Sequence, residues 1–197
     1  RQAFFYQICS PSRNCPCPME RRLREHGALD GEDGHLARWR GRGGTMKYTE
    51  AKFGRMFVLR LEDGEIVHEV VEKFAAARRI KSGVVFAVGA ADRGSQLVVG
   101  PARRAERPVR PMRVSLEDPH ELSGVGTIFP DEKGRPVLHM HAAAGRRRKT
   151  TTGCVRAGVK VWEILEVVIM ELKCAGTVRR RDATLGFALL SVGMTRK

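Results

Sequence analysis

The sequence predicts an α+β domain in which one principal helix packs on a mainly antiparallel sheet. Apolar residues cluster or alternate in about eight short segments separated by turn residues, which is typical of strands. Only one segment, residues 66–81, repeats its apolar side chains at helical spacing. Short strands in succession around a single helix favour antiparallel pairing over the alternating strands and helices of a parallel sheet.

The expected helix, residues 66–81, follows a turn at Glu62-Asp63-Gly64. Asp63 near its start and Gly83 just past its end suit the two ends of a helix. Its apolar side chains are Val67, Val70, Val71, Phe74 and Ala77. This spacing puts them on one face, which should pack on the sheet.

Turn residues and glycines separate the remaining elements. Strands are expected at residues 53–61, 84–90, 96–99, 109–116, 121–129, 137–143, 159–162 and 165–172. The turn at 92–94 should pair the strand before it with the strand after it, and 130–134 should form a hairpin turn. Residues 145–152 are expected to form a basic loop.

The chain has 197 residues, which suits one domain with an appendage. Regular patterning begins at Met46, so we expect one domain over 46–193, a tail at 194–197 and a disordered leader at 1–45. Two glycines and a threonine precede Met46, as a translated purine-rich ribosome-binding sequence would give. We therefore interpret the leader as an upstream extension and Met46 as the native start.

Targeting signals are not evident in the sequence. No apolar run approaches the roughly 18 residues of a transmembrane helix, and residues 1–17 lack the continuous apolar stretch of a signal peptide. The chain has five cysteines, an odd number that fits reduced thiols. We expect a cytoplasmic protein that does not enter a membrane.

The most informative motif is His139-Met140-His141, followed by Cys154. In a strand, residues i and i+2 point to the same face, so the two imidazoles should lie side by side. Two imidazoles and a thiolate suit Zn²⁺ and leave its fourth coordination position open. On spacing alone, two solvent-facing strand histidines are the favoured interpretation of the motif.

Four segments carry a resemblance to a known family: 124–129, 138–146, 153–154 and 158–169. Together they resemble the PPC (plants and prokaryotes conserved) domain, often described as having a "PD1-like" DNA-binding motif. The match extends over about residues 46–193. His139 and His141 correspond to the family's His-x-His, whereas Cys154 takes the place of a third family histidine.

The resemblance implies a site, an assembly and an α+β fold. It implies a zinc ion held by His139, His141 and Cys154, with Glu166 as a partner of an imidazole or as a base. It also implies a homotrimer. Glu166 is equally well explained as an ordinary strand carboxylate.

The net charge is +14, which favours an anionic partner. Residues 1–45 carry 8 basic and 5 acidic side chains and residues 46–197 carry 28 and 17, so the excess belongs to the predicted domain. A dense basic run consists of Arg146, Arg147, Arg148 and Lys149. These side chains could contact DNA phosphates without sequence preference, although such runs are often merely solvated.

Plant members of the family carry AT-hooks with an Arg-Gly-Arg-Pro core. The similar run 133–136 falls in the predicted hairpin turn, so the chain resembles the prokaryotic type without an AT-hook. We predict a zinc-containing binding or regulatory protein that associates with DNA through basic loops. The alternative is a zinc-dependent enzyme acting on a small anionic substrate held by Arg146 and its neighbours. The sequence has no phosphate loop or nucleophile motif, which favours the binding role without deciding it.

Overall fold

The computed structural model describes residues 38–41 and 44–193. Most of the predicted leader and the tail at 194–197 lie outside the described residues. Across the predicted boundary between leader and domain, β1 (Arg38–Gly41) and β2 (Gly44–Lys47) pair as a short antiparallel hairpin that was not predicted from the sequence. This hairpin belongs to a different compact unit from the domain that begins at Tyr48.

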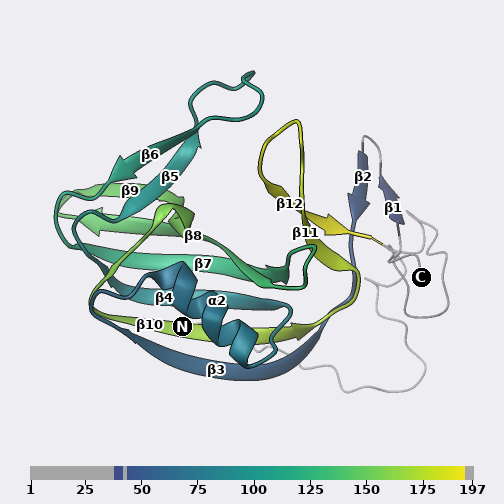
Figure 1. Cartoon of the computed structure of the whole chain (residues 1–197), viewed down its shortest axis with the longest axis horizontal. Helices are drawn as coiled ribbons and strands as arrows, with labels where there is room; N and C mark the ends of the chain where they lie inside the picture. The colour runs from purple at the N-terminus through teal and green to yellow at the C-terminus, as the bar shows by residue number, and fades with distance from the viewer. Residues whose placement is uncertain (1–37, 42–43, 194–197) are drawn as a thin grey trace, which may run out of the picture. The chain divides into compact units, whose positions relative to one another are not determined.

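Eight antiparallel strands form the sheet of that domain, in the order β3-β10-β4-β7-β8-β9-β5-β6 (Figure 1). The strands are β3 (Lys52–Glu62), β4 (Gly83–Ala91), β5 (Gln96–Pro101), β6 (Pro111–Ser115), β7 (His120–Pro130), β8 (Pro136–Arg146), β9 (Lys149–Cys154) and β10 (Val161–Lys173). A separate two-stranded sheet consists of β11 (Thr177–Arg181) and β12 (Ala188–Val192). The helices of the described ranges are α2 (Val67–Ala77) and the short 3-10 helix η1 (Val155–Ala157).

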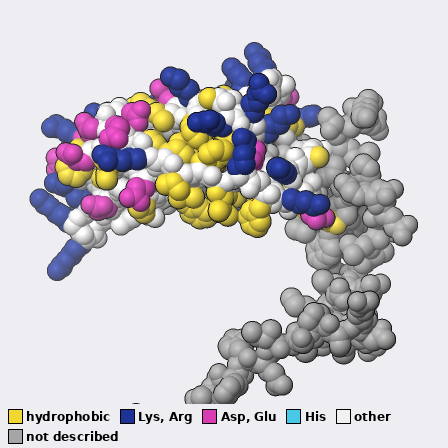
Figure 2. Space-filling view, turned by 90° about the horizontal axis from the view of Figure 1, so that it is seen from below, with side chains coloured by type: hydrophobic (Ala, Val, Ile, Leu, Met, Phe, Trp, Pro, Cys, Tyr) yellow, Lys and Arg dark blue, Asp and Glu magenta, His cyan; other side chains and the backbone are white. Residues whose placement is uncertain are grey.

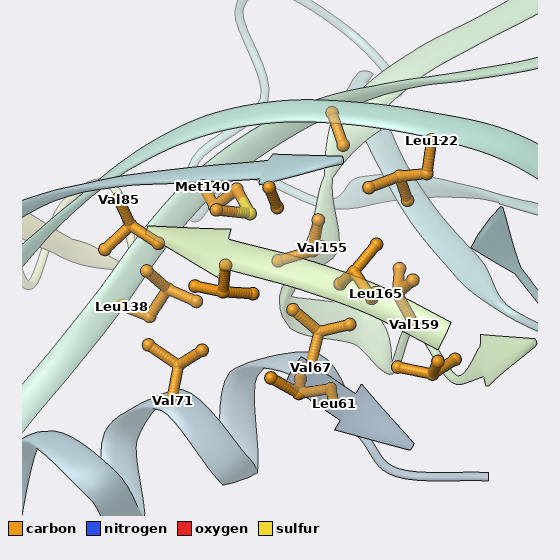
Figure 3. Close-up of a cluster of buried hydrophobic side chains, with 14 of the residues drawn as sticks. Leu61, Val67, Val71, Val85, Leu122, Leu138, Met140, Val155, Val159 and Leu165 are labelled. Atoms are coloured by element: carbon orange, nitrogen blue, oxygen red, sulfur yellow. The ribbon is translucent and has the colours of Figure 1, made fainter. Parts of the chain in front are cut away.

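The predicted antiparallel sheet with one principal helix is confirmed, although the sheet dominates the helix. The helix α2 lies against one face of the sheet (Figure 1). Its residues Val67 and Val71 meet strand residues such as Val85 and Leu138 in a cluster of fully buried side chains (Figure 3). Of the helices in the described part, none is long and apolar enough to cross a membrane.

The helix ends four residues earlier than predicted. Its last turn closes with two backbone bonds, from Arg79 N to Ala76 O at 3.1 Å and from Ile80 N to Ala75 O at 2.8 Å. Arg79 has φ 57°, the left-handed conformation that typically stops a helix with this bond pattern. Gly83, predicted as the end signal, is instead the first residue of β4.

Three predictions about strands were wrong. The strand β4 pairs with β10 and β7, and not with β5 across the turn at 92–94. Segments 159–162 and 165–172 belong largely to one strand, β10, whose irregular register includes Glu163 at φ 59°. The expected loop at 145–152 is a hairpin, because β9 pairs with β8 up to Lys149 opposite Arg146. Three consecutive threonines, which are β-branched, suit this unpredicted strand.

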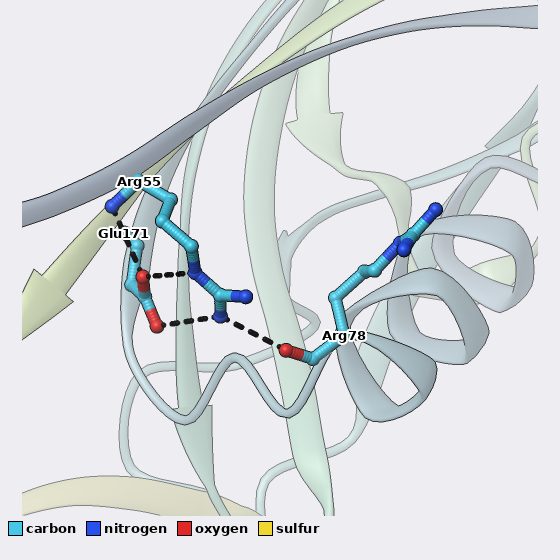
Figure 4. Close-up of polar contacts among 3 residues, drawn as sticks. All are labelled: Arg55, Arg78 and Glu171. Carbon is cyan, nitrogen blue, oxygen red and sulfur yellow. Dashed lines mark hydrogen bonds and ion pairs between the residues drawn. The ribbon is translucent and has the colours of Figure 1, made fainter.

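An ion pair fastens the end of α2 to the edge of the sheet (Figure 4). The guanidinium of Arg55 on β3 donates to both carboxylate oxygens of Glu171 on β10, at 2.8 and 3.0 Å. The same guanidinium donates to the backbone oxygen of Arg78, just after the helix, at 2.9 Å. These hydrogen bonds lower the pKa of Glu171 from 4.5 to about 2.

We predict that Glu171→Gln lowers the melting temperature by roughly 2 to 4 °C near neutral pH. Because the pKa of Glu171 is lower in the folded protein, its stabilisation is fully present above pH 4.5 and is lost as the pH falls to about 2. Thermal melts followed by circular dichroism should therefore show the two proteins converging over that range. A difference that stays constant with pH would contradict this.

The matched control is Glu62→Gln. Glu62 pairs with Arg60 at 3.2 Å, but both side chains are more than half exposed. Water screens such pairs, so this change should leave the melting temperature nearly unaltered.

Candidate metal centre

The strand β8 presents its two histidines on the face of the sheet opposite to α2. Leu138 and Met140 are buried on the helix side, and their alternation with His139 and His141 directs both imidazoles away from the core. Gly126 on β7 lies opposite Met140, where a Cβ would come within 2.7 Å of the Met140 Cβ. Because Gly126 has no side chain, Met140 can occupy the core, and its neighbours His139 and His141 then face outward.

The neighbouring strand β9 brings the third group. Cys154 is the direct partner of His141 in the β8–β9 ladder and also of Val98 on β5. At the preceding residue, Gly153, a Cβ would lie 2.6 Å from the backbone oxygen of Val98. Only glycine allows β5 to approach β9 this closely, so Gly153 helps to hold Cys154 beside the histidines.

The three ligand atoms form a compact set. The Nε2 atoms of His139 and His141 are 3.2 Å apart, and the Cys154 sulfur and the two imidazoles all lie within 4.8 Å of one another. Two nitrogens bound to Zn²⁺ at about 2.0–2.1 Å in a tetrahedron lie about 3.3 Å apart. The imidazole pair therefore already has the spacing that a tetrahedral ion needs, and the donor set fits zinc.

His139 is suited to act as a neutral ligand. Burial, followed by the positive charges of Arg179 and Arg156, lowers the pKa of His139 from 6.5 to about 4. The imidazole is therefore unprotonated at neutral pH, and a metal ion does not have to displace a proton from it.

A cleft of about 930 Å³ opens beside this triad. Its walls come from β5, β8 and β9, from residues 104–113 and from β11 and β12. Five arginines line it: Arg104, Arg107, Arg113, Arg156 and Arg179. Within the described ranges, no Asp or Glu lines the cleft, so its electrostatic potential is positive.

The basic run predicted to contact anions lies elsewhere. Arg146 is five residues beyond His141 on β8, about 17 Å along an extended strand. It pairs with Asp118 at 2.9 Å and donates to the backbone oxygen of Pro119. Arg147 and Arg148 form the exposed turn between β8 and β9, and Lys149 begins β9. None of the four lines the cleft at the triad.

Glu166 also lies away from the metal centre. It is an exposed residue of β10, which is separated from β8 by β4 and β7. Three strand spacings put it about 14 Å from β8. Within this chain, Glu166 is therefore a strand carboxylate and not a partner of the imidazoles.

The cleft-lining residue that sequence reasoning did not single out is Arg179. It lies on β11, is 4% exposed and donates to Thr127 Oγ1 on β7 at 3.0 Å. Residue 179 is within a run of three arginines, which looks like a solvated surface. Because residues 179, 180 and 181 are all arginine, no alternation in this segment marks residue 179 as the buried one.

The AT-hook-like run 133–136 forms a tight turn between β7 and β8, as predicted. Asp131 Oδ1 accepts hydrogen bonds from the backbone of Lys133 and Arg135, and the Arg135 guanidinium pairs with Asp131 at 2.7 Å. An AT-hook lies extended in the minor groove, and this closed turn does not offer that conformation.

Comparison with solved structures shows the same fold at low identity. A metal-containing protein from Archaeoglobus fulgidus is 24% identical, with a TM-score of 0.64 over 74% of this chain and 99% of that one. A PPC protein from Pyrococcus horikoshii is 20% identical, with a TM-score of 0.64 over 74% and 97%. A candidate DNA-binding protein from Bacteroides thetaiotaomicron is 14% identical, with a TM-score of 0.56 over 72% and 97%.

Comparison with curated proteins gives no match. The family comparison does: residues 48–173 match the Plants and Prokaryotes Conserved (PCC) domain, the family that the histidine strand and its neighbours predicted. Because the match spans more than half of the sequence, the chain belongs to the PCC domain family.

Proposed function

We propose that this chain is a metal-binding member of its family and that His139, His141 and Cys154 hold one zinc ion. The observation that carries the proposal is the placement of three donor atoms within 4.8 Å on two paired strands. Zinc is favoured over harder cations because the donors are imidazole nitrogens and a thiolate, and not oxygens. Three protein ligands leave one coordination position for an exogenous group.

A binding or regulatory role fits this site better than hydrolysis. The charged side chains around the triad are arginines, which hold anions but do not exchange protons at neutral pH. A zinc-dependent hydrolase needs a base that can take a proton from its nucleophile. The positive cleft therefore supports a protein that binds an anion at its metal, with the enzyme as the competing candidate.

We also propose that the protein assembles as a homotrimer through the open face of its sheet. Large apolar side chains are exposed on this face, including Met56 and Val58 on β3 and Phe86 and Val88 on β4, with Val58 82% exposed. In the view from the β3 side, hydrophobic side chains gather in one patch bordered by basic ones (Figure 2). A contiguous apolar patch of this kind is typical of an interface.

DNA association is a second candidate function. Arg147 and Arg148 are exposed at the tip of a tight hairpin, and Arg147 has φ 57°, so the turn projects both side chains from the sheet. With Lys149, they could contact the phosphates of DNA without reading its sequence.

The zinc proposal predicts about one zinc per chain, by elemental analysis, in protein purified without chelator. His139→Ala and Cys154→Ser should both lower this content, because each removes a strong ligand. Zinc should also be released as the pH falls, since protons compete for the ligands. His139 itself, with its pKa lowered to about 4, is half protonated only near that pH.

The matched control is His120→Ala. His120 is a histidine of β7 whose Nδ1 lies 2.7 Å from the backbone oxygen of Asp118, away from the triad. This change should leave the zinc content unaltered. Less than about 0.2 zinc per chain in the original protein, with no further loss in His139→Ala, would reject the site.

The assembly proposal predicts a trimer by light scattering at micromolar concentration. Val58→Asp should give smaller species, because a charge would be buried in the apolar interface. Ala76→Asp places the same change on the exposed side of α2 and should leave the trimer intact. A monomeric original protein would refute the proposal.

The DNA proposal predicts affinity that falls steeply between about 50 and 200 mM salt. Changing Arg147 and Arg148 together to Ala should weaken binding and reduce the slope of log affinity against log salt by about 2. Lys133→Ala, in the AT-hook-like turn, should have no effect. DNA binding that survives the double change would exclude the β8–β9 turn as the contact.

A further inference from the structure

The side chain of Arg179 carries a buried charge without a carboxylate partner. Its Nη2 donates to Thr127 Oγ1 at 3.0 Å, whereas its Nε is buried and has no hydrogen-bond partner in the described part of the chain. The ion pairs of the described residues do not include it. The Phe129 ring, 5.8 Å from the guanidinium carbon, offers only a cation–π contact. A buried guanidinium is costly unless an anion or several acceptors satisfy it.

The cleft that Arg179 lines is the one beside His139, His141 and Cys154. A divalent ion held by two neutral imidazoles and one thiolate keeps a net charge of +1. Arg156 and Arg179 add positive charge next to it, and the described residues supply no acidic side chain to this cleft. The group that fills the open position should therefore be an anion in preference to a neutral molecule.

A second part of the cleft wall is apolar. It includes Phe187, Leu189 and Leu190 on or beside β12, each about 40% exposed, together with Leu185 and Val109. The volume of about 930 Å³ is far more than a single inorganic anion needs and lies in the usual range for organic ligands. An occupant that satisfies both walls has an anionic end and an apolar body.

We propose that this cleft binds a small amphipathic carboxylate. Its carboxylate is held by the guanidinium of Arg179 and occupies the open position of the metal, and its apolar body lies against the Phe187–Leu190 wall. The planar carboxylate matches the two-pronged guanidinium and is also an ordinary zinc ligand. The metal contact rests on the zinc proposal above, whereas the Arg179 and apolar contacts do not.

The test is calorimetric titration of the full-length, zinc-loaded protein with octanoate and with acetate at fixed ionic strength. Octanoate should bind at least about tenfold more tightly than acetate, because only octanoate buries an apolar chain. Arg179→Gln should weaken octanoate binding by about tenfold or more, the usual loss for a hydrogen-bonded charge. Leu190→Ser should weaken octanoate binding and leave acetate unchanged, because Leu190 lies directly opposite Arg179 in the β11–β12 ladder and so shares its face.

The matched control is Arg180→Gln. Arg180 is the next residue on β11 but is exposed and does not line the cleft, so its change should alter neither affinity. Circular dichroism and zinc content, measured for each variant, separate loss of the site from loss of the fold.

Three results would overturn the proposal. Equal affinities for octanoate and acetate would show that the apolar wall does not contact the bound ligand. Octanoate binding that is unchanged in Arg179→Gln would show that Arg179 does not hold the carboxylate. Tighter binding of octyl phosphate than of octanoate would replace the carboxylate by a phosphate. If the protein holds no zinc, the zinc proposal fails, but the Arg179 and Leu190 variants still test this inference in the metal-free protein.

Discussion

The alternation of side chains along β8 ties the hydrophobic core to the metal centre. Leu138 and Met140 are at most 1% exposed, and every residue between or beside them points to the other face. A shift of one residue in the β7–β8 register would bury the imidazoles and expose the core. The helix fixes this register further, because Glu72 on α2 accepts a hydrogen bond from the backbone N–H of Leu138 at 2.8 Å. The register that the core requires therefore also orients His139 and His141, so the site needs little ordering of its own.

Much of the fold was predictable because its signals are local. Period-2 alternation identified β3, β7 and β8, and helical spacing identified α2. The same alternation placed His139 and His141 on one face. Cys154 could not be joined to them by spacing, because its place opposite His141 depends on the hairpin at Arg147 and Arg148. Only the resemblance to the family placed Cys154 with the two histidines.

Long-range contacts decide where three charged side chains lie, and the local sequence does not show them. Arg146 looked available to a ligand, but its charge is paired with Asp118, 28 positions earlier in the chain. Glu166 looked like a partner of the imidazoles, but two strands that precede it in sequence lie between it and β8. Arg179 belongs to a run of three arginines, but its side chain is buried against β7, where it contacts Thr127 and Phe129. In each case the surroundings of a charged side chain are set by sheet topology and not by residues nearby in the sequence.

The substitution of cysteine for the family histidine and the buried Arg179 are consistent with each other. A third imidazole would leave the metal with its full charge of +2 next to Arg156 and Arg179. In the proposed zinc site, the Cys154 thiolate would bring the negative charge that the described lining of the cleft otherwise lacks. A negative charge at Cys154 raises the pKa of Arg179, against the stronger, opposite effect of burial. On that proposal, the reduced charge of the metal site lets several arginines lie beside it while the cleft still attracts an anion.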